Sequence, residues 1–278
     1  MNESLISLVD DFLQEHFKKC TKQSSERSLR LLEVIEYSVF SGGKRFRPLV
    51  GFRIAEALGC ATSRVVPFLA AVELVHTFSL IHDDLPCMDD DDFRRDRPTS
   101  HRVFGEAMAL LAGDALLSEA FFVLGKHYYN IPEVGLELTK LLAEAVGYKG
   151  MIAGQVIDIL SASQSAEEFM QLHELKTGAL ICVVAEGVAA IARTDTKERE
   201  ALREYGKLIG LAFQIVDDML DADTETSGLP KLIGLEATKR LLEQTTKNAV
   251  AQLELLSEAG LVTDALREMV EWNIHRKK

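Results

Sequence analysis

Apolar residues recur along almost the whole chain at the spacing that one face of an α-helix requires. In the first window Leu5, Leu8, Val9 and Phe12 share one side of a helix, because residues three and four apart lie on the same face. Further windows with this spacing cover residues 31–39, 48–58, 66–82, 104–128, 133–147, 151–161, 167–192, 198–222, 235–257 and 262–274. The pattern predicts a chain that is helical almost throughout.

Signals for strands are missing from the sequence. Runs of alternating apolar and polar residues bounded by Asn-Gly or Asp-Gly do not occur, which disfavours a β-sandwich or a doubly wound sheet. No linker rich in proline, glycine or serine divides the chain, and no fixed-period repeat is evident. We therefore expect an all-α, single-domain helical bundle spanning residues 1–278.

Composition narrows the classes of function. The chain has 278 residues, of which 47% are hydrophobic, and its formal net charge is −12. This apolar content excludes a disordered chain. The acidic excess argues against nucleic acid or anionic lipid as a general partner, because polyanions are repelled at long range. A phosphate-bearing ligand must therefore be bound by a local cluster of basic residues.

Cysteine spacing and the amino terminus favour a cytoplasmic protein. The four cysteines lack the spacing of a metal site or a disulfide framework, so we expect reduced thiols. The first residues include neither the basic region nor the apolar stretch of a signal peptide. The most apolar run, 178–192, contains Glu186 and is shorter than the roughly 18 residues that a membrane span requires. We expect it to form a buried helix, and we expect no membrane span.

The densest chemical signal is the segment HDDLPCMDDDDFRRDRP. Six aspartates fall within ten residues here: Asp83, Asp84, Asp89, Asp90, Asp91 and Asp92. Two such charges ~4 Å apart repel by about 1 kcal/mol in bulk water and about 4 kcal/mol at an effective dielectric near 20, so partial burial requires cations or protons. Carboxylates without histidine or thiolate ligands favour Mg²⁺. The alternative is a solvated acidic loop.

A second acidic cluster lies inside an apolar helical window, in FQIVDDMLD. Asp217, Asp218 and Asp221 are three or four residues apart and share one helix face, where like charges destabilise the helix. Gln214 lies one turn earlier on that face and can hydrogen-bond an anion or a metal-bound water. One such cluster can be a surface helix face, but two of them favour metal ions bound around a single polyanion.

Basic residues occur where a phosphate would have to bind. The segment SGGKRFRP offers Lys44, Arg45 and Arg47 after two glycines, whose backbone N–H groups can approach an anion. Arg94 and Arg95 beside the first aspartate run have the planar fork that suits phosphate contact. The alternatives are a helix-connecting turn for the glycines and simple charge balance for the two arginines.

Two further features carry weaker signals. In HELKTGAL, Gly178 can kink a helix and present Lys176 and Thr177 inward. His76 lies two turns before Asp83 on the same helix face. A single histidine on an apolar face is more often a core residue than a ligand.

These residues resemble those of the trans-prenyltransferases, the short-chain trans-isoprenyl diphosphate synthase family, which includes farnesyl and geranylgeranyl diphosphate synthases. The resemblance covers nearly the whole chain, from GGKRFRP through DDLPCMD, GQVID, KTG and FQIVDDMLD to a basic tail. It implies the isoprenoid synthase fold, an all-helical bundle that is usually a homodimer. It also implies that the two Asp-rich motifs face each other across a central cavity.

The resemblance assigns roles to individual residues. The expected ligands of about three Mg²⁺ ions, which would bind an allylic diphosphate, are Asp83, Asp84 and Asp89 in the first motif and Asp217 and Asp221 in the second. Contacts with the allylic substrate would come from Arg94, Lys176, Thr177 and Gln214. Isopentenyl diphosphate would be bound by Lys44, Arg47, His76 and Arg95. The expected catalytic residues are Asp83, Asp84, Asp89, Arg94, Lys176 and Asp217.

The implied reaction needs no protein nucleophile. Mg²⁺ with nearby lysine and arginine stabilises the departing pyrophosphate, and the resulting allylic cation is attacked by the double bond of isopentenyl diphosphate before a proton is lost. In the family, the residues just upstream of the first motif, here Phe78 and Ser79, set the product length. The aromatic ring of Phe78 favours a fifteen-carbon farnesyl product. The small Ser79 leaves a twenty-carbon geranylgeranyl product as the alternative.

One segment departs from the family pattern. A GKxTxP-like loop, whose lysine helps to bind the allylic diphosphate, usually follows the second motif. Here Ser227, Gly228, Leu229 and Pro230 lead directly to KLIGLEATK, so Lys231 cannot be given that lysine's role. At the carboxy terminus Arg276, Lys277 and Lys278 resemble a basic tail that covers the site in relatives, although a charged terminus is usually solvated.

Two other functions compete with an active prenyltransferase. A non-catalytic prenyltransferase subunit is expected to lose one Asp-rich motif, and both are present here. A terpene cyclase shares the first motif and the ionisation chemistry. That function explains neither the second DDxxD segment nor the basic residues at Lys44 and Arg47.

Overall fold

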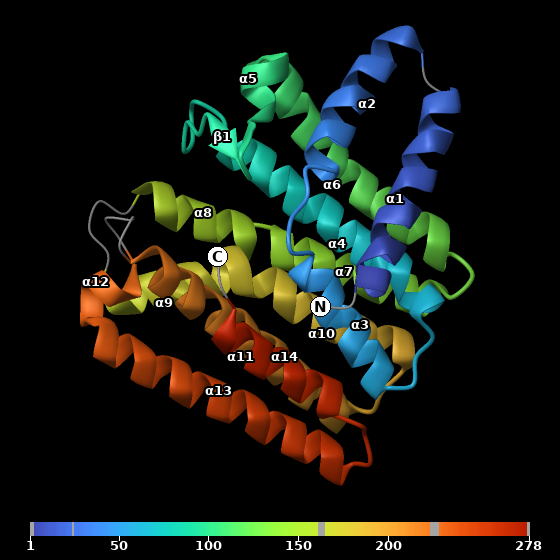
Figure 1. The fold of residues 1–278 in the computed structure, drawn as a ribbon. Coiled ribbons are helices and arrows are strands. Elements are labelled where there is room, and N and C mark those ends of the chain that lie inside the picture. Colours follow the sequence, from blue (N-terminus) through green and yellow to red (C-terminus); the bar gives the residue numbers. More distant parts are fainter. Residues whose placement is uncertain (1–2, 24, 161–164, 223–227, 277–278) are drawn as a thin grey trace. The chain divides into compact units, whose positions relative to one another are not determined.

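The all-α prediction is confirmed by a computed structural model of the chain (Figure 1). The structure describes residues 3–23, 25–160, 165–222 and 228–276. The helices are α1 (Glu3–Gln23), α2 (Glu26–Val39), α3 (Phe46–Ala57), α4 (Thr62–Asp83), α5 (Ser100–Phe104), α6 (Glu106–Tyr128), α7 (Pro132–Val146), α8 (Met151–Leu160), α9 (Ala166–His173), α10 (Ala179–Ala192), α11 (Thr196–Asp221), α12 (Leu229–Ile233), α13 (Leu235–Glu258) and α14 (Asp264–His275). Each helical window predicted from periodicity overlaps one or more of these elements and extends beyond their bounds by no more than about two residues, except that residue 161 lies outside the described residues.

Contacts between residues divide the chain into two compact units. Unit 1 comprises residues 1–49 and 63–139, and unit 2 comprises residues 50–62 and 140–278. The first Asp-rich motif belongs to unit 1 and the second to unit 2. The single domain over residues 1–278 stays a prediction, and each unit is described below by itself.

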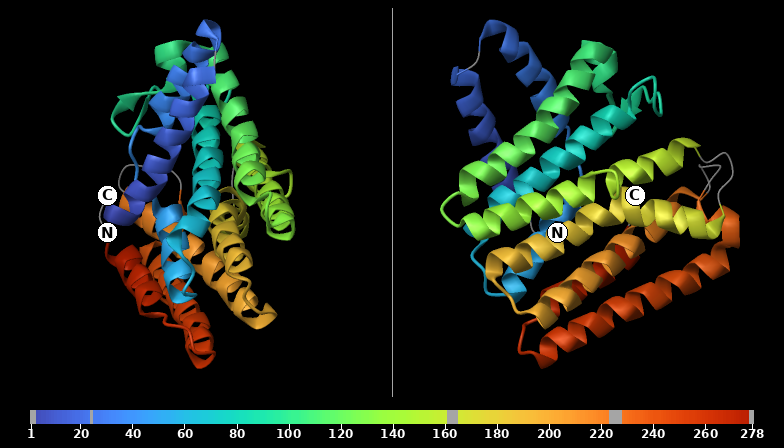
Figure 2. Two further views of the ribbon diagram at one scale, coloured as in Figure 1. Left: turned by 90° about the vertical axis from the view of Figure 1, so that its right-hand side faces the viewer. Right: turned by 180° about the vertical axis from the view of Figure 1, so that it is seen from behind.

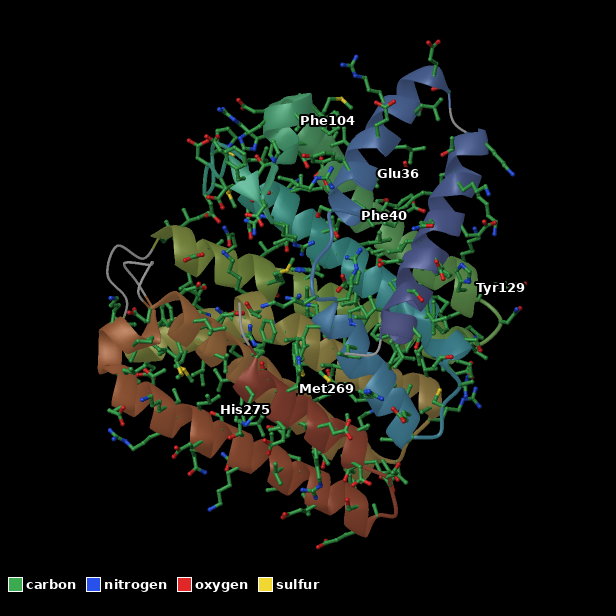
Figure 3. The ribbon with its side chains drawn as sticks, in the orientation of Figure 1. Glu36, Phe40, Phe104, Tyr129, Met269 and His275 are labelled. Carbon is green, nitrogen blue, oxygen red and sulfur yellow. The ribbon has the colours of Figure 1, made fainter. Side chains whose placement is uncertain are left out.

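In unit 1, α4 carries the first Asp-rich motif at its carboxyl end. Fourteen of its 22 residues are buried, on all sides of the helix, which explains why its sequence is apolar almost throughout. The hairpin of α1 and α2 belongs to the same unit. The rings of Phe17 and Phe40 meet edge to face across this hairpin, with centroids 6.3 Å apart; Figure 3 labels Phe40.

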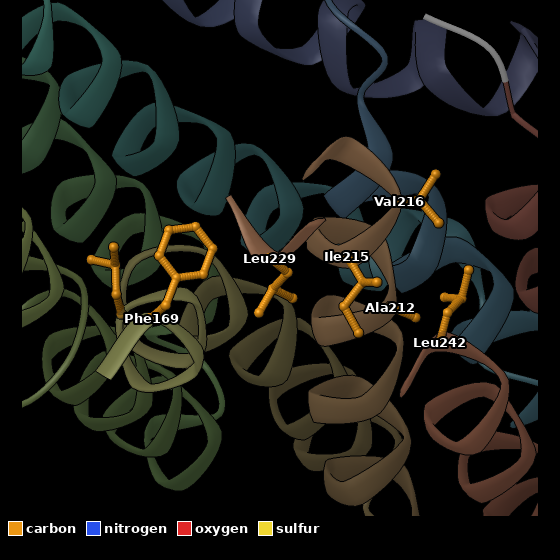
Figure 4. Packing of buried hydrophobic residues seen from close by; sticks show 7 residues of the cluster. Phe169, Ala212, Ile215, Val216, Leu229 and Leu242 are labelled. Atoms are coloured by element: carbon orange, nitrogen blue, oxygen red, sulfur yellow. The ribbon is translucent and has the colours of Figure 1, made fainter. Parts of the chain in front are cut away.

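In unit 2, α11 carries the second Asp-rich motif in its last turns. The helix begins at a capping box, in which the Asp195 carboxylate accepts the N–H of Glu198 and the Glu198 carboxylate accepts the N–H of Asp195. Figures 1 and 2 show α13 and α14 beside α11. The carboxyl half of α11 packs into an apolar cluster shown in Figure 4, which comprises Phe169, Leu172, Ala212, Ile215, Val216, Leu229 and Leu242. This packing fixes the helix turns that carry the aspartates.

Two local structures were not predicted. A short antiparallel hairpin, β1 (Phe93–Arg94) with β2 (Arg97–Pro98), follows the first aspartate run. Its turn residues Arg95 and Asp96 have φ of +54° and +60°, as a two-residue type I′ turn requires. The second is a π-helical turn, η1 (Glu174–Gly178), between α9 and α10. The kink expected at Gly178 is therefore a π-turn, a feature frequent at functional sites.

This π-turn also corrects the expectation that the apolar run 178–192 is too short to span a membrane. The helix continues through η1, so the segment Ala166–Ala192 has 27 residues. By length and composition alone, three helical segments among the described residues could cross a membrane: Thr62–Asp83, Glu106–Tyr128 and Ala166–Ala192. In their most apolar windows 78%, 39% and 61% of the residues, respectively, are buried inside the protein. The absence of a membrane span stays a prediction.

Candidate active site

The first aspartate run forms a closed loop at the end of α4. Asp83 is the last residue of the helix, and its carbonyl accepts the N–H of Asp89 at 2.9 Å. Asp90 follows with a positive φ of +53°. The loop therefore brings the backbones of Asp83 and Asp89 together, although they are six residues apart in sequence. Asp83 is partly exposed and Asp89 is exposed, so both carboxylates are accessible to a hydrated cation.

Asp84 has a different environment from its neighbours. Its side chain is buried, and its Oδ1 accepts a hydrogen bond from Nε of Arg94 at 2.6 Å. Burial raises the pKa of Asp84, and the Arg94 guanidinium opposes that rise. Arg94 also contacts Asp91 at 3.4 Å. The positive charge of Arg94 thus offsets the negative charges of Asp84 and Asp91, as in the alternative role considered for it. Asp84 in turn holds the Arg94 side chain in position.

The glycine pair before Lys44 accommodates Arg95. The guanidinium of Arg95 donates to the carbonyl of Gly42 and to Ser41 Oγ. A Cβ on Gly43 would lie 2.6 Å from the Arg95 guanidinium carbon, and Gly43 has a φ of +122°. Glycine is favoured here mainly by this positive φ, which strains residues that have a side chain, whereas the end of the flexible Arg95 side chain could shift. Lys44, the next residue, is exposed.

Arg45 is a structural residue, which corrects its inclusion among the candidate phosphate ligands. Its side chain is only 5% exposed and lies 2.8–3.0 Å from the carboxylates of Asp10 and Glu73. Its Nη2 also donates to the carbonyl of Val39 at 2.7 Å. The Arg45 guanidinium is occupied inside unit 1 and does not face solvent.

His76 lies among the basic residues predicted to bind isopentenyl diphosphate. Its pKa is well below the usual value, because burial disfavours the imidazolium and because the charges of Arg47, Arg95, Arg45 and Arg94 repel it. In unit 1 the charges of Arg47 and Arg95 thus act on His76, and the predicted role of these residues in binding isopentenyl diphosphate stays a prediction. A neutral imidazole among guanidinium groups is suited to hydrogen-bond an anion.

The lowered pKa of His76 predicts a pH-dependent stability. In the unfolded chain its pKa is about 6.5, so the unfolded state binds more protons than the folded state once the pH falls below that value. The free energy of unfolding is therefore unaffected by the protonation of His76 above pH ~6.5. Below that pH it falls by up to about 1.4 kcal/mol per pH unit, until the lower pKa of the folded state is reached. We expect His76→Gln to reduce this acid loss in urea unfolding, whereas His275→Gln, at an exposed histidine, should not change it. Equal acid loss in wild type and His76→Gln would contradict this assignment.

The two residues predicted to set product length lie on α4 before the loop. Phe78 is buried, and its ring meets the His82 imidazole edge to face with centroids 5.0 Å apart. The Ser79 hydroxyl donates to the carbonyl of His76 at 2.9 Å. Phe78 therefore has a fixed ring orientation, while Ser79 contributes little volume.

In unit 2, Asp217 is paired with the basic tail. Nη1 of Arg276 lies 2.7 Å from Asp217 Oδ1, and the side chain of Arg276 is only 2% exposed. Arg276 also donates to Asn273 and to the carbonyl of Phe213, whose ring lies 4.0 Å from the guanidinium carbon. The alternative of a solvated terminus therefore does not apply to Arg276. Lys277 and Lys278 lie outside the described residues.

Asp218 is buried, unlike Asp217, so the three aspartates do not form one accessible face. Its Oδ2 accepts the N–H of Leu229 at 3.2 Å, and its Oδ1 accepts Nε2 of Gln214 at 3.4 Å. Nε2 of His173 lies 3.3 Å from Oδ2. These contacts fix α9 and the start of α12 to α11. The sequence analysis did not single out His173, and its only local signal is its place three residues before Lys176.

Asp217 and Asp221 are thus the partly exposed carboxylates of this motif. They lie one turn apart on the same helix face, and Asp221 is the last residue of α11. Both clusters offer carboxylate oxygens at partly exposed positions, which is the donor type that Mg²⁺ prefers. Asp83 and Asp89 in unit 1 and Asp217 and Asp221 in unit 2 therefore fit the predicted metal.

The π-turn presents Lys176 to α8. Its Nζ lies 2.7 Å from Asp158 Oδ2, the last residue of the GQVID segment. A Cβ on Gly154 would lie 2.6 Å from the backbone nitrogen of Lys176, so glycine is required for α8 to approach η1. Thr177 follows Lys176 in the same turn and is partly exposed. The GQVID and KTG segments therefore form one structural element.

The segment after the second motif forms a short helix. Of the residues Ser227 to Lys231, Ser227 lies outside the described residues, and α12 begins at Leu229 after Gly228, which has a φ of +116°. Lys231 is exposed on this helix. The bond from Leu229 N–H to Asp218 sets where the helix starts.

Comparison with known proteins places this arrangement in a family. A family model described as polyprenyl synthetase matches residues 29–252. Farnesyl diphosphate synthase of Bacillus subtilis (strain 168) is 40% identical over 84% of this chain and 85% of its own. Geranylgeranyl pyrophosphate synthase 12, chloroplastic, of Arabidopsis thaliana is 41% identical over 81% of this chain and 69% of its own.

The fold is also found among solved structures. The apo crystal structure of a FPP/GFPP synthase from Zymomonas mobilis has a TM-score of 0.87 and 34% sequence identity, over 98% of this chain and 100% of that chain. Its similarity extends over both Asp-rich motifs, because almost the whole chain is covered. The chain therefore belongs to the polyprenyl synthetase family of trans-prenyl diphosphate synthases and is a prenyltransferase with the isoprenoid synthase fold.

Proposed function

We propose that this protein is a Mg²⁺-dependent farnesyl diphosphate synthase, which condenses isopentenyl diphosphate with dimethylallyl or geranyl diphosphate. The observation that carries the proposal is the pair of carboxylate clusters, Asp83 with Asp89 and Asp217 with Asp221, each next to a buried or half-buried arginine. Charged groups of both signs within each cluster suit a metal-bound diphosphate. The relative from Bacillus subtilis carries the same name.

The residues of the chain contribute binding, orientation and charge to this reaction. When bound, Mg²⁺ stabilises the negative charge that develops on a departing diphosphate. Arg94 and Lys176 add positive charge for the allylic diphosphate, whose C–O bond breaks with its electron pair leaving on oxygen. Arg47, His76 and Arg95 orient isopentenyl diphosphate, so that its double bond attacks the allylic carbon. A proton is then lost to the released diphosphate, and the chain needs no nucleophile of its own.

Product analysis tests this function directly. Purified protein is incubated with Mg²⁺, isopentenyl diphosphate and an allylic diphosphate, and the products are separated by mass spectrometry. Chain elongation that stops at fifteen carbons supports a farnesyl diphosphate synthase. No turnover would indicate a non-catalytic subunit, and a cyclic hydrocarbon would indicate a terpene cyclase.

A geranylgeranyl product is the second candidate. The Arabidopsis thaliana relative named geranylgeranyl pyrophosphate synthase 12 is as similar to this chain as the bacterial farnesyl enzyme, at 41% against 40% identity. The buried ring of Phe78 favours the shorter product, because it occupies volume that a longer chain would need.

We expect Phe78→Ala to lengthen the product. Removing the ring opens space beside His82 on α4, where we expect Phe78 to stop the growth of the prenyl product. The measurement is the ratio of twenty-carbon to fifteen-carbon products, which we expect to rise about tenfold, equivalent to ~1.4 kcal/mol. Phe68→Ala is the matched control, because Phe68 is fully buried on the same helix ten residues earlier. An unchanged ratio in Phe78→Ala would place the length determinant elsewhere.

We further propose that the enzyme is a cytoplasmic homodimer. On α6 the large apolar residues Leu110, Leu111 and Phe122 are about half exposed. Exposed apolar side chains on one helix are typical of a surface that binds another protein, here a second copy of the chain. The four cysteines are thiols, as is usual in the cytoplasm. Sedimentation equilibrium tests the assembly: twice the chain mass of 30.8 kDa supports a dimer, and 30.8 kDa contradicts it.

A further inference from the structure

Three potential metal ligands from two helices of unit 1 meet away from both Asp-rich motifs. His16 and Cys20 lie one turn apart on α1, and Glu119 lies on α6. The ligand atoms of the three side chains are all within 4.8 Å of one another. Nε2 of His16 lies 2.6 Å from Glu119 Oε1 and 3.9 Å from Cys20 Sγ. Residues 103 positions apart in sequence are thus brought to one point.

These distances suit a tetrahedral metal after a small adjustment. With Zn–N near 2.0 Å and Zn–S near 2.3 Å, neighbouring ligand atoms in a tetrahedral site are about 3.3–3.6 Å apart. The His16–Cys20 distance is slightly above that range, and the His16–Glu119 distance is below it. Glu119 can move outward, because its side chain is 29% exposed, whereas the side chain of His16 is only 4% exposed. Rotation of Glu119 would make room for an ion, and Cys20 Sγ would have to move a few tenths of an ångström toward His16.

The surroundings leave space for a fourth ligand. A cavity of about 280 Å³ adjoins the three side chains and is lined also by Lys19, Phe122 and Lys126. This volume exceeds the roughly 30 Å³ that a water molecule occupies, so water can complete the coordination. Three protein ligands with one open position form a frequent zinc arrangement.

Aromatic rings fix the orientation of the histidine. The His16 ring stacks on Phe12 with centroids 6.3 Å apart and meets Phe17 edge to face at 5.5 Å. Phe122 lies 6.3 Å from it on a third side. A ring held in this way is oriented before an ion binds, which lowers the entropic cost of binding.

The two lysines beside the cavity have other partners. Nζ of Lys19 lies 3.3 Å from the carboxylate of Glu15, one turn earlier on α1. Nζ of Lys126 lies over the ring of Phe122, 5.5 Å from its centroid. The Glu15 carboxylate therefore offsets the charge of Lys19, which reduces its repulsion of a bound cation.

We propose that His16, Cys20 and Glu119 form a binding site for Zn²⁺ that links α1 to α6. A thiolate, an imidazole and a carboxylate select zinc or a similar transition metal over Mg²⁺, which prefers oxygen ligands. The site is structural: a metal bound to both helices ties the amino-terminal helix to unit 1 and stabilises the folded chain by mass action.

Cobalt substitution tests the site in the full-length protein. Chelator-treated protein is titrated with Co²⁺ in the presence of saturating Mg²⁺, which occupies the aspartate clusters. We expect one equivalent of Co²⁺ to produce a thiolate-to-cobalt charge-transfer band and the visible bands of tetrahedral cobalt, and Zn²⁺ to displace both. Cys20→Ser should abolish the charge-transfer band, and His16→Gln should weaken Co²⁺ binding at least tenfold.

Controls separate this site from the other thiols. Cys87→Ser and Cys182→Ser should keep the band, because Cys87 lies in the first aspartate loop and Cys182 lies in unit 2. Zn²⁺ should raise the Tm of wild type and of Cys182→Ser, and the rise should be smaller in Glu119→Gln, which retains the other two ligands. A band that survives in Cys20→Ser, a band lost in Cys87→Ser, or no band with wild type at equimolar Co²⁺ would overturn the proposal.

Discussion

Replacing Asp217 with asparagine is expected to lower kcat by about 10²- to 10³-fold while lowering the free energy of unfolding by only about 1 kcal/mol. The substitution removes the charge that we propose binds Mg²⁺, and it preserves a side-chain oxygen that can accept the hydrogen bond from Arg276 Nη1. Alanine would remove that oxygen as well and would leave the buried guanidinium with one partner fewer. Asparagine therefore separates the chemical role of Asp217 from its structural one.

The Mg²⁺ concentration that gives half-maximal rate is the deciding measurement. We expect it to rise in Asp217→Asn, because one ligand of a hard cation has become neutral. Arg276→Gln is the matched control: it weakens the same contact from the other side and leaves the carboxylate in place. A variant Asp217→Asn with wild-type kcat and wild-type Mg²⁺ dependence would refute the metal role. A similar rise for Arg276→Gln would show that the pair, and not the carboxylate alone, controls the metal.

Hydrophobic periodicity predicted the helices because each of them buries one face or all of its faces inside a compact unit. The window at residues 198–222 became α11, whose apolar side packs into the cluster around Ile215. The π-turn at Glu174–Gly178 had no such signal, because it shifts the apolar pattern by a single residue at one point of a long apolar window. The hairpin was missed because Arg95 and Asp96 occupy turn positions where glycine or asparagine is usual.

Residue type and spacing predicted the two acidic motifs, but they did not predict which aspartates of each motif are buried. Asp84 and Asp218 are buried, while Asp83 and Asp217 are partly exposed, and the proposed role of Asp84 as a metal ligand stays a prediction. The partner that decides each case is Arg94 or the Leu229 backbone, ten or eleven residues further along the chain. Such pairings depend on tertiary packing, which a local spacing rule does not contain.

Arg45 shows the same limit in a basic motif. It stands between Lys44, which is exposed, and Arg47, whose charge reaches His76, and its own guanidinium faces the interior. Its carboxylate partners Asp10 and Glu73 lie 35 and 28 positions away in sequence. The motif GGKRFRP therefore combines residues for binding with one residue for folding.

Replacing Arg45 with methionine is accordingly expected to cost about 3–5 kcal/mol of unfolding free energy. Methionine fills similar volume without a charge, and it leaves the Glu73 carboxylate, which is 3% exposed, without its guanidinium partner. The loss should appear as a lower urea midpoint with an unchanged m value. Lys44→Met is the matched control. Because Lys44 is exposed, we expect the unfolding free energy of this variant to stay within about 0.5 kcal/mol of wild type.

A double variant distinguishes an unpaired buried charge from a general loss of packing. Arg45→Met combined with Glu73→Leu removes both charges, so its stability should be higher than that of Arg45→Met alone, even though two residues have changed. The coupling between the two sites is measured by comparing both single variants with the double variant. Additive losses in this cycle, or a loss below about 1 kcal/mol in Arg45→Met, would contradict the role assigned to the buried pair.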